Sequence, residues 1–325
     1  MTNRSKIKID SKEFLFLLLP VSAILISMGT HISLPNVYPA DYDPQTYFPF
    51  LEVCLVVYIG LVMVSLFWKK LRMTLVNLSG IIFVAFLLIE VLDIMTLKTG
   101  MLELPFIPSP DKTLSSFTLY PDRVIPSLFA SMQLLLTGCL IGFVTGFISG
   151  VLMGWSKIAN YWISPILKLV GPVPSAAWLP IAVVIMPDNH AAGLFLIALS
   201  VWFPLTLMLS SAIRATDVRL VESARVMGAS EAYILFHVAL PAAMPAIFDG
   251  LFMGLSASFG ALVVAEMLGV KDGLGWYLTW SKQWSDYGRV FSTTGIFIII
   301  FFLLIQLLFF IRRKVLKWQK GLVRW

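Results

Sequence analysis

Long apolar runs separated by short polar connectors dominate the chain. A helix needs about 20 predominantly apolar residues to cross a hydrocarbon core of about 30 Å. Runs of this kind predict eight membrane-spanning helices, near residues 14–34, 51–68, 74–96, 127–153, 165–187, 191–213, 246–269 and 291–311. The fifth run contains three prolines, which remove backbone donors and predict a broken helix. The pattern therefore predicts an all-α polytopic membrane protein.

A polar stretch of residues 214–245 separates the sixth and seventh predicted spans. Asp217 is placed to cap a short helix over residues 218–227, because its carboxylate can accept hydrogen bonds from the first free backbone N–H groups. Gly228 is placed to end that helix, since glycine commonly follows a helix C-terminus. Ser230 is placed to cap a second helix. The sequence thus predicts two short helices joined at a glycine turn.

The second of these helices is expected to end before Leu240 and Pro241, because proline lacks the backbone donor that a helix interior uses. The first helix carries more apolar side chains than a solvated connector needs, namely Val218, Leu220, Val221, Val226 and Met227. An apolar patch at a membrane surface is typical of a site where a partner docks. The alternative is an amphipathic helix that lies on the lipid interface.

Composition and charge agree with a membrane protein and orient it. The 325 residues are 58% apolar and 13% charged, whereas about a quarter of residues are charged in soluble domains. Eighteen Lys and Arg residues lie on one side of the predicted spans and six on the other. This bias predicts that both termini and residues 214–245 are cytoplasmic. No basic face with interleaved aromatic residues is found, so nucleic acid is not an expected partner.

The sequence contains no motif for catalysis or for a cofactor. Cys54 and Cys139 lie inside apolar runs and are expected to pack as small hydrophobic side chains. The three histidines are scattered, so no catalytic residue and no metal site is predicted, and an intramembrane hydrolase is disfavoured. No Gly-Lys dipeptide occurs, which excludes a Walker A loop. Any ATP hydrolysis must therefore come from another polypeptide, and this chain is predicted to bind no cofactor.

Glycines recur at every fourth residue along the fourth predicted span, at Gly138, Gly142, Gly146, Gly150 and Gly154. In lipid, small residues let helix backbones approach closely, which replaces the hydrophobic drive that is absent there. The glycines therefore predict a helix–helix contact within the subunit. A pore-lining surface is the alternative.

Charges and helix breaks inside the membrane are the candidates for a translocation pathway. Burying a charge in lipid is costly, and broken helices line substrate sites in many transporters. The pathway candidates are Pro172, Pro174, Ser175, Trp178, Pro180, Ser256, Ser258 and Glu266. Glu266 is also placed to hold a helix, and the prolines to form a kink without substrate contact. Glu90 and Asp93 share one face of the third span, with helix pairing as the alternative to a functional role.

Six residues of the polar stretch have the spacing of a known motif: Glu222, Ser223, Ala224, Gly228, Leu240 and Pro241. This spacing resembles the cytoplasmic EAA loop of ABC importer permeases, in which Glu-Ala-Ala is followed by Gly and then by Ile-x-Leu-Pro. The sequence departs from that pattern at Ser223, in place of alanine, and at Val238, in place of isoleucine. The resemblance implies that these six residues couple the chain to a separate ATPase.

Five further stretches extend the resemblance over roughly two-thirds of the chain. They are IPSP, MGWS, GPVPSAAWLP, WFP and VVAEMLGVKDGLGWYL, in that order between residue 107 and residue 278. This order resembles the nitrate, sulfonate and taurine group of these permeases. It implies a transmembrane core of the type I ABC importer kind, in the plasma (inner) membrane of a prokaryote.

The resemblance also implies a set of partners for a permease that spans the lipid bilayer several times. These are two cytoplasmic ABC ATPase subunits, which use ATP and Mg²⁺, a second permease copy or a paralogue, and an extracytoplasmic solute-binding protein. The implied cargo is a small anion such as a sulfonate, taurine or nitrate. Importers of a thiamine precursor or another small heterocycle share this architecture and are one alternative. An ion-coupled secondary transporter is another, although no inverted repeat is evident in the sequence.

The same reasoning predicts a division of the chain. Residues 1–72 would be an additional N-terminal pair of spans, and residues 73–126 the first helix of the family type with its extracytoplasmic connector. Residues 127–312 would be the permease core that carries the coupling loop, followed by a basic cytoplasmic tail at 313–325.

Overall fold

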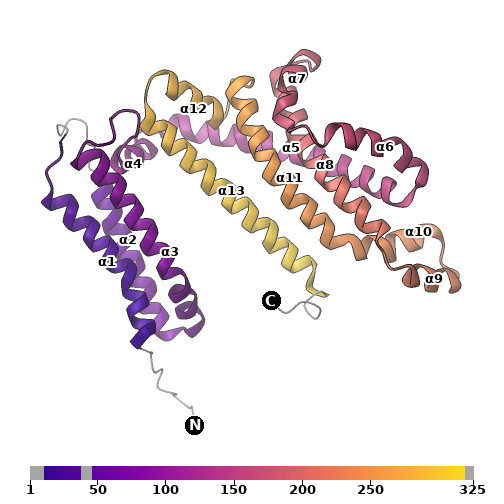
Figure 1. The fold of residues 1–325 in the computed structure, drawn as a ribbon, viewed down its shortest axis with the longest axis horizontal. Coiled ribbons are helices and arrows are strands. Elements are labelled where there is room, and N and C mark those ends of the chain that lie inside the picture. Colours follow the sequence, from indigo (N-terminus) through magenta and orange to yellow (C-terminus); the bar gives the residue numbers. More distant parts are fainter. Residues whose placement is uncertain (1–10, 38–45, 319–325) are drawn as a thin grey trace, which may run out of the picture. The chain divides into compact units, whose positions relative to one another are not determined.

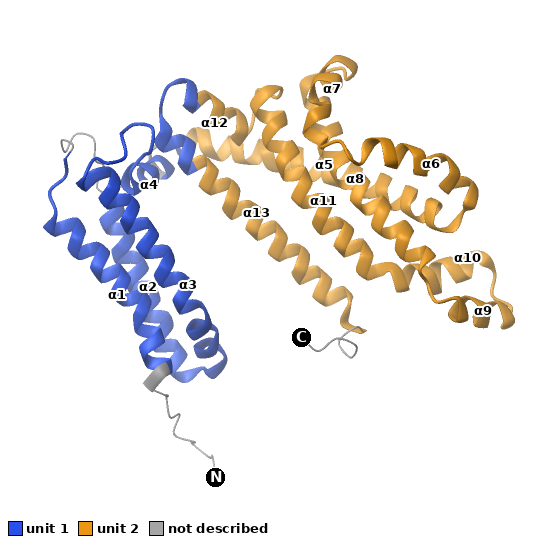
Figure 2. Ribbon diagram, viewed as in Figure 1, with its two compact units in different colours: residues 1–121, 281–292 blue, residues 122–280, 293–325 orange. Residues whose placement is uncertain are grey.

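The computed structural model describes residues 11–37 and 46–318 (Figure 1). Every regular element in these two ranges is a helix, which confirms the predicted all-α class. The chain divides into two compact units, which are coloured separately in Figure 2. Unit 1 comprises residues 1–121 and 281–292, and unit 2 comprises residues 122–280 and 293–325.

The helices of the N-terminal part are α1 (Ser11–Ser33), α2 (Tyr47–Phe67), α3 (Lys69–Asp93), the π-helical turn η2 (Ile94–Lys98) and α4 (Pro110–Leu119). Those that follow are α5 (Pro121–Trp155), α6 (Lys157–Val170), the 3-10 turn η3 (Ser175–Trp178), α7 (Leu179–Ile185), α8 (Asn189–Arg214), α9 (Val218–Val226), α10 (Glu231–Ile234), the π-helical turn η4 (Leu235–Ala239), α11 (Leu240–Leu268), α12 (Leu274–Gln283) and α13 (Tyr287–Val315).

Unit 1 is built on a bundle of α1, α2 and α3 in alternating directions (Figure 1). Leu17 packs with Tyr58 and Leu75 near one end of the bundle. Ile24 packs with Leu51 one to two turns further along α1, so α1 and α2 are antiparallel. The third helix is an uninterrupted span, because η2 continues α3 to Lys98. The predicted boundary at residue 72 falls inside α3, which packs on both of its predecessors.

Unit 2 is organised around α8, which lies between α5 and α11. A Cβ atom on Gly142 would lie 2.8 Å from Val201 Cβ, and one on Gly254 would lie 2.9 Å from Val201 Cα. The α8 backbone is therefore in close contact with a glycine from each side, as small residues permit between helices in lipid. All five glycines of the fourth predicted span face α8, from Gly138 against Ile197 to Gly154 against Ile213.

The order of these contacts gives the directions of the helices. From Gly138 to Gly154, the partner on α8 moves forward by the same number of residues, so α5 and α8 run in the same direction. The residues between α5 and α8 form α6, η3 and α7. Because α5 and α8 are parallel, these residues must lead from the end of α5 back to the opposite end of α8, where that helix begins. Its two halves, Lys157–Val170 and Ser175–Ile185, meet at an angle of 91°. The single fifth span predicted at 165–187 is thus a bent pair of helices, broken at the prolines that follow Gly171.

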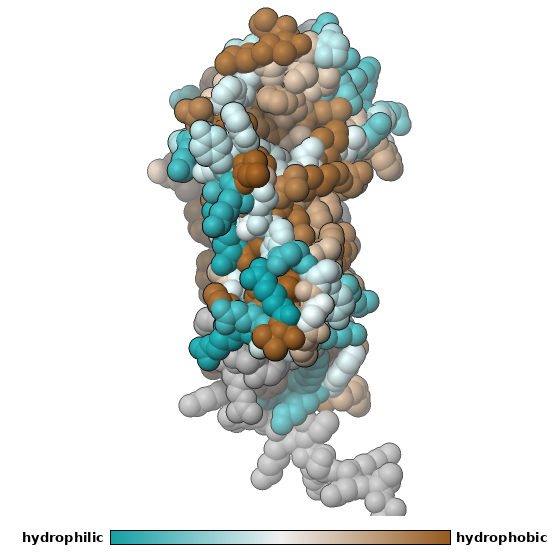
Figure 3. Space-filling model, turned by 90° about the vertical axis from the view of Figure 1, so that its right-hand side faces the viewer, coloured by the Kyte–Doolittle hydropathy of each residue, from teal (hydrophilic) through white to brown (hydrophobic). Residues whose placement is uncertain are grey.

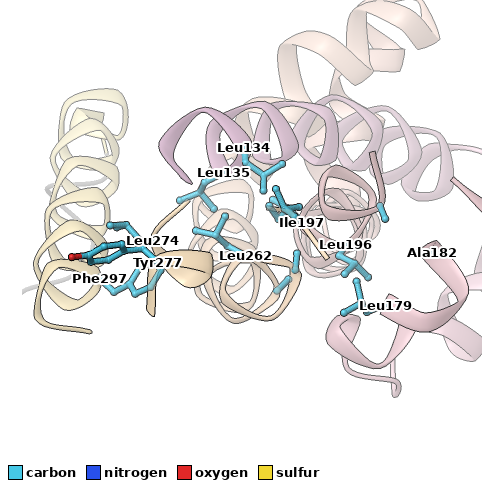
Figure 4. Close-up of a cluster of buried hydrophobic side chains, with 14 of the residues drawn as sticks. Leu134, Leu135, Leu179, Ala182, Leu196, Ile197, Leu262, Leu274, Tyr277 and Phe297 are labelled. Atoms are coloured by element: carbon cyan, nitrogen blue, oxygen red, sulfur yellow. The ribbon is translucent and has the colours of Figure 1, made fainter. Parts of the chain in front are cut away.

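The main core of unit 2 lies where α5, α8, α11, α12 and α13 meet (Figure 4). Leu135, Leu196 and Leu262 are fully buried there, and Tyr277 of α12 fills the space beside Phe297 of α13. Within the described residues, seven long apolar helices and the bent pair match the eight spans expected from the sequence. The core therefore fixes α8, the helix that leads into residues 214–245, on two sides.

Candidate functional site

The α9–α10 segment, residues 214–245, begins with a side-chain cap. The Asp217 carboxylate accepts a hydrogen bond from the backbone N–H of Arg219 at 3.0 Å. Helix α9 then runs from Val218 to Val226, one residue shorter than predicted. An acidic cap also complements the positive end of the helix dipole.

Gly228 ends α9 in a left-handed conformation, with φ +81°. Its N–H donates to the carbonyl of Arg225 at 2.9 Å, and the N–H of Ala229 donates to the carbonyl of Ala224 at 3.0 Å. These two bonds form a Schellman motif, which satisfies carbonyls that the helix end leaves free. No atom lies within 4 Å of a Cβ built at Gly228, so the requirement for glycine here is conformational rather than steric.

The second helix of the segment starts at Ser230, whose hydroxyl accepts from the N–H of Tyr233 at 3.2 Å. The prediction that this helix ends before Leu240 is wrong, because one helical path continues from Glu231 to Leu268. Proline lacks the N–H that an α-helical turn would use, and its ring would clash with the carbonyl four residues earlier. The π-helical turn η4, in which the N–H of Leu240 donates to Leu235, widens the backbone just before Pro241.

Exposure along α9 separates a buried face from an open one. Ala224 is buried, whereas Glu222 and Ser223 are exposed. Val226 and Met227 are 89% and 80% exposed, the largest apolar exposure in the segment. Leu240 is partly buried and Pro241 exposed. The side of the molecule seen in Figure 3 shows hydrophobic and hydrophilic groups next to each other. On α9, the exposed apolar side chain of Val226 lies one turn after the exposed carboxylate of Glu222.

The segment is tied to the membrane helices at its base. Arg214, the last residue of α8, donates to the carbonyl of Met153 at 3.1 Å and to the side chain of Asn160 at 2.7 Å. Buried apolar side chains from α8, η4 and α11 pack beneath it, namely Leu205, Leu209, Ile213, Ala239, Ala243 and Ile247. The base of the α9–α10 segment is therefore continuous with α8 and α11.

Two adjoining pockets lie along α8, beside the break between α6 and α7. The Ser175 pocket has a volume of about 240 Å³ and is lined by Val170, Gly171, Val173, Pro174, Ser175, Leu199, Ser200, Phe203, Pro204, Met253 and Ala257. The Lys168 pocket has a volume of about 460 Å³ and is lined by Met153, Ser164, Leu167, Lys168, Gly171, Pro172, Phe203 and Leu207. Gly171 and Phe203 belong to both linings.

Three of the residues proposed for the pathway line these pockets. Pro174 and Ser175 line the first, and Pro172 lines the second. The hydroxyl of Ser175 forms a hydrogen bond with that of Ser200 at 2.7 Å. Trp178 packs against the core, and Pro180 is exposed; neither lines either pocket.

The two serines proposed on α11 lie away from both pockets. Ser256 donates to the carbonyl of its own helix at Phe252, and Ser258 is fully buried beside Cys139 of α5. Met253 and Ala257 of the same helix line the Ser175 pocket instead. Sequence reasoning selected polar residues and so missed these apolar ones.

Glu266 holds a helix and lines neither pocket. It is 1% exposed, and its carboxylate accepts from the N–H of Gly275 at 2.7 Å, in the first turn of α12. A Cβ atom at Gly273 would lie 2.3 Å from this carboxylate, which explains the absence of a side chain there. In the same turn, the N–H of Leu274 donates to Ser131 of α5 at 2.8 Å. These contacts favour the interpretation that Glu266 holds the start of α12 in place over the interpretation that it contacts the cargo.

Glu90 and Asp93 are buried inside unit 1, at 3% and 0% exposure. Glu90 accepts from the hydroxyl of Thr30 on α1 and lies 3.5 Å from that of Tyr47 on α2. His31 lies 3.5 Å from Asp93. The two carboxylates thus join α3 to both neighbouring helices by polar contacts.

Comparisons with known proteins agree on one family. A family described as "Binding-protein-dependent transport system inner membrane component" matches residues 142–317. The "Putative aliphatic sulfonates transport permease protein SsuC" of Bacillus subtilis (strain 168) is 29% identical over 224 residues, which is 68% of this chain and 81% of that protein. The "Taurine transport system permease protein TauC" of Escherichia coli (strain K12) is 27% identical over 221 residues, 66% of this chain and 80% of that protein.

Two further similarities complete the comparison. The "Nitrate import permease protein NrtB" of Synechococcus elongatus is 26% identical over 177 residues, 54% of this chain and 62% of that protein. A solved structure described as "Crystal structure of an amino acid ABC transporter with histidines" covers 64% of this chain and 98% of its own, with a TM-score of 0.50 and 19% identity. This last similarity concerns the fold alone.

Proposed function

This chain belongs to the family of binding-protein-dependent transport system inner membrane components, and from that premise we propose that it is the permease subunit of an ATP-driven importer of small anions. The family membership confirms the resemblance seen in the sequence. It makes the chain a multi-pass translocation subunit of a membrane transporter.

The α9–α10 segment carries the proposal for energy coupling. It combines the exposed carboxylate of Glu222, the apolar surface of Val226 and Met227, and a turn fixed by Gly228. An exposed apolar patch of this kind marks a protein interaction site. A separate ATPase subunit is the proposed partner, since the sequence has no Gly-Lys dipeptide for a phosphate-binding loop of its own. ATP and Mg²⁺ are used by that subunit.

Two such ATPase subunits would grip two permease subunits, either two copies of this chain or one copy and a paralogue. An extracytoplasmic solute-binding protein would deliver the cargo. Closure of the ATPase pair around ATP would pull the two α9–α10 segments together and shift the path between its outward and inward openings. A ligand or nucleotide drives such a shift only through its different affinity for the two states.

The charges and the contacts inside unit 2 support the proposed orientation. Arg312 of α13 forms an ion pair with Asp249 of α11 at 2.8 Å, so the basic C-terminal region lies at the end of α11 that adjoins the α9–α10 segment. Basic residues favour the cytoplasmic side. We therefore place this end of unit 2, with the C-terminus, in the cytoplasm of a prokaryotic cell, and assign the N-terminus to the same side from the eight-span count.

The cargo proposal rests on the names of the relatives, which refer to aliphatic sulfonates, taurine and nitrate. These are small molecules that carry a sulfonate or nitrate group. We propose that this chain conducts a cargo of the same chemical class.

Reconstitution tests the proposal. The chain is assembled in vesicles with an ABC ATPase and a solute-binding protein from the same organism, and uptake of labelled ethanesulfonate, taurine and nitrate is measured with and without ATP. We expect uptake of at least one anion that requires ATP and stops when the ATPase carries a lysine substitution in its phosphate-binding loop. Uptake by the chain alone, driven by an ion gradient and indifferent to nucleotide, would show a secondary transporter instead.

A further inference from the structure

We propose that Lys168 holds the negative charge of the cargo inside the translocation path, and that the ring of Phe203 against Gly171 separates its pocket from the Ser175 pocket. The inference rests on the proposed function and deepens it, because it assigns the recognition of an anion to one side chain of this chain.

The two pockets follow one another along α8. Leu199 and Ser200 of α8 line the Ser175 pocket, Phe203 lines both pockets, and Leu207 lines the Lys168 pocket. These positions follow one face of α8 in order, at the spacing of helical turns. The series runs towards Arg214, from which the α9–α10 segment emerges. A solute that moves along α8 towards that segment would therefore meet the Ser175 pocket first and the Lys168 pocket second.

The Phe203 side chain lies between the two pockets and lines both of them. A Cβ atom on Gly171 would lie 2.1 Å from Cε2 and 2.3 Å from Cζ of the Phe203 ring. The ring thus occupies the space that any side chain at position 171 would need. A solute that passes from one pocket to the next must displace this ring, which one rotation about its side-chain torsions can achieve.

Lys168 is the only charged residue among the described residues that line the two pockets. No carboxylate contributes to either lining, and no ion pair of Lys168 is found within residues 11–37 and 46–318. The remaining lining is apolar apart from three serines. Lys168 is itself exposed, so its ammonium group is open to a solute in this pocket. A lining with one positive and no negative charge would attract an anion and repel a cation.

A purely structural role for Lys168 is the competing explanation. Lys168 lies in the last turn of α6, where a cation also interacts favourably with the helix dipole. That role would stabilise α6 without any effect on a solute. A test must therefore report on charge in the pocket and on anion occupancy, and not on folding alone.

Modification of a cysteine placed beside Lys168 provides such a readout. Ser164 lines the same pocket one turn earlier on α6, and residues at this spacing are neighbours on the helix surface. In full-length chain with Cys54→Ser and Cys139→Ser, the Ser164→Cys variant is labelled in membrane vesicles with an anionic, sulfonate-bearing methanethiosulfonate and with its trimethylammonium counterpart. The rate ratio of the two reagents measures the local potential.

We expect Lys168→Gln to lower the anionic-to-cationic rate ratio about tenfold, since one unit charge acts on the two reagents with opposite sign. Ethanesulfonate in the buffer should slow labelling when Lys168 is present and should not slow it in Lys168→Gln. The matched control is Lys157→Gln, because Lys157 is exposed on the first turn of the same helix and lines neither pocket. An unchanged ratio, or equal protection in both backgrounds, overturns the assignment.

Transport by the assembled importer separates this inference from the function on which it rests. With the solute-binding protein and ATPase present, Lys168→Gln should lower the maximal rate of ATP-driven anion uptake about tenfold, whereas Lys168→Arg should retain most of it. Phe203→Ala should let anions leak between compartments without ATP. If the wild type shows no ATP-driven uptake, the proposed function fails. If the wild type transports anions and Lys168→Gln matches it, the inference alone fails.

Discussion

Arg225 and Glu231 form an ion pair across the turn at Gly228, with the guanidinium nitrogens 2.9 and 3.0 Å from the same carboxylate oxygen. The pair connects the last turn of α9 to the first turn of α10. It is roughly half exposed, so its contribution to stability is expected to be small, about 0.2–1 kcal/mol. Its geometric effect is to restrict the angle between the two short helices.

Charge reversal tests this restriction. Arg225→Glu should bring two carboxylates together and increase backbone hydrogen exchange at Ala229 by up to about fivefold, which corresponds to about 1 kcal/mol. The double variant Arg225→Glu with Glu231→Arg should restore slow exchange. Equal exchange rates in the single variant and the wild type would show that the Schellman hydrogen bonds alone hold the turn.

Substitution of Gly228 separates backbone strain from charge. Gly228→Asn should be tolerated, because asparagine adopts the left-handed conformation more readily than other residues and the site has open space. Gly228→Asp has nearly the same shape but adds a negative charge to the surface where we propose that the ATPase docks. We expect normal membrane insertion of both variants and loss of ATP-driven uptake with Asp. Normal transport by Gly228→Asp would contradict docking at this turn.

Glu222 offers a second test of the docking surface. Its side chain is exposed on α9 and has no ion pair within the described ranges, so its charge is available to a partner. Glu222→Lys should reduce the amount of ATPase that co-purifies with the chain, by an amount typical of a lost interface charge contact, about tenfold or more in affinity. Glu103→Lys, an exposed site outside residues 214–245, serves as the control. Equal recovery with both variants would exclude a contact at Glu222.

Glu266 is expected to act on stability and not on cargo. Glu266→Ala leaves the N–H of Gly275 unpaired in a buried site, which costs about 1–3 kcal/mol. Glu266→Gln keeps an acceptor oxygen and should lose less. We expect a lower melting temperature for Ala than for Gln in detergent, with uptake per folded subunit unchanged in both. A Glu266 variant with a normal melting temperature and a low uptake rate would show that Glu266 has a role in transport.

Glu90 tests the polar interior of unit 1. Glu90→Leu removes the hydrogen bond between α3 and the Thr30 hydroxyl, which can still donate to the carbonyls of Ile26 and Ser27 on its own helix. The expected cost is therefore the net value of one hydrogen bond, about 0.5–1.5 kcal/mol. Because Glu90 lines neither pocket along α8, the expected result is weaker packing of α1 on α3 with uptake per inserted subunit preserved. Protease sensitivity of the N-terminal helices measures the first effect. Loss of uptake with intact packing would assign Glu90 a role in transport.

Local rules predicted much of the α9–α10 segment from the sequence. Asp217, Gly228 and Ser230 each act through backbone groups within a few residues, so their type and spacing suffice to predict the caps and the turn. Pro241 was misread because its effect depends on the turn before it. A proline commonly ends an α-helix, but here the wider π-helical turn η4 lets the helix continue through Pro241. No residue type in the sequence predicts such a turn.

The pockets were harder to predict because they depend on which helices meet. The ridge from Gly138 to Gly154 indicates a close contact, but the sequence does not identify α8 as its partner or show that the two helices run in parallel. The pathway candidates were chosen for charge, polarity and the prolines that break a helix, whereas most of the pocket lining consists of apolar side chains with neither property. Phe203 and Gly171 were missed for that reason, although the GP and WFP stretches that contain them had been noted for the family resemblance.

The tight fit of α8 between two glycine-bearing helices has a mechanical consequence. Because α8 is closely packed against α5 and α11, it resists bending and can shift or tilt only together with these two helices. Phe203 lies about 16 Å from Arg214 along α8, at the rise of about 1.5 Å per residue of a regular α-helix. A force on the turn at Gly228 would therefore displace α8 as a whole, and a small movement of the α9–α10 segment would be enough to move the Phe203 ring.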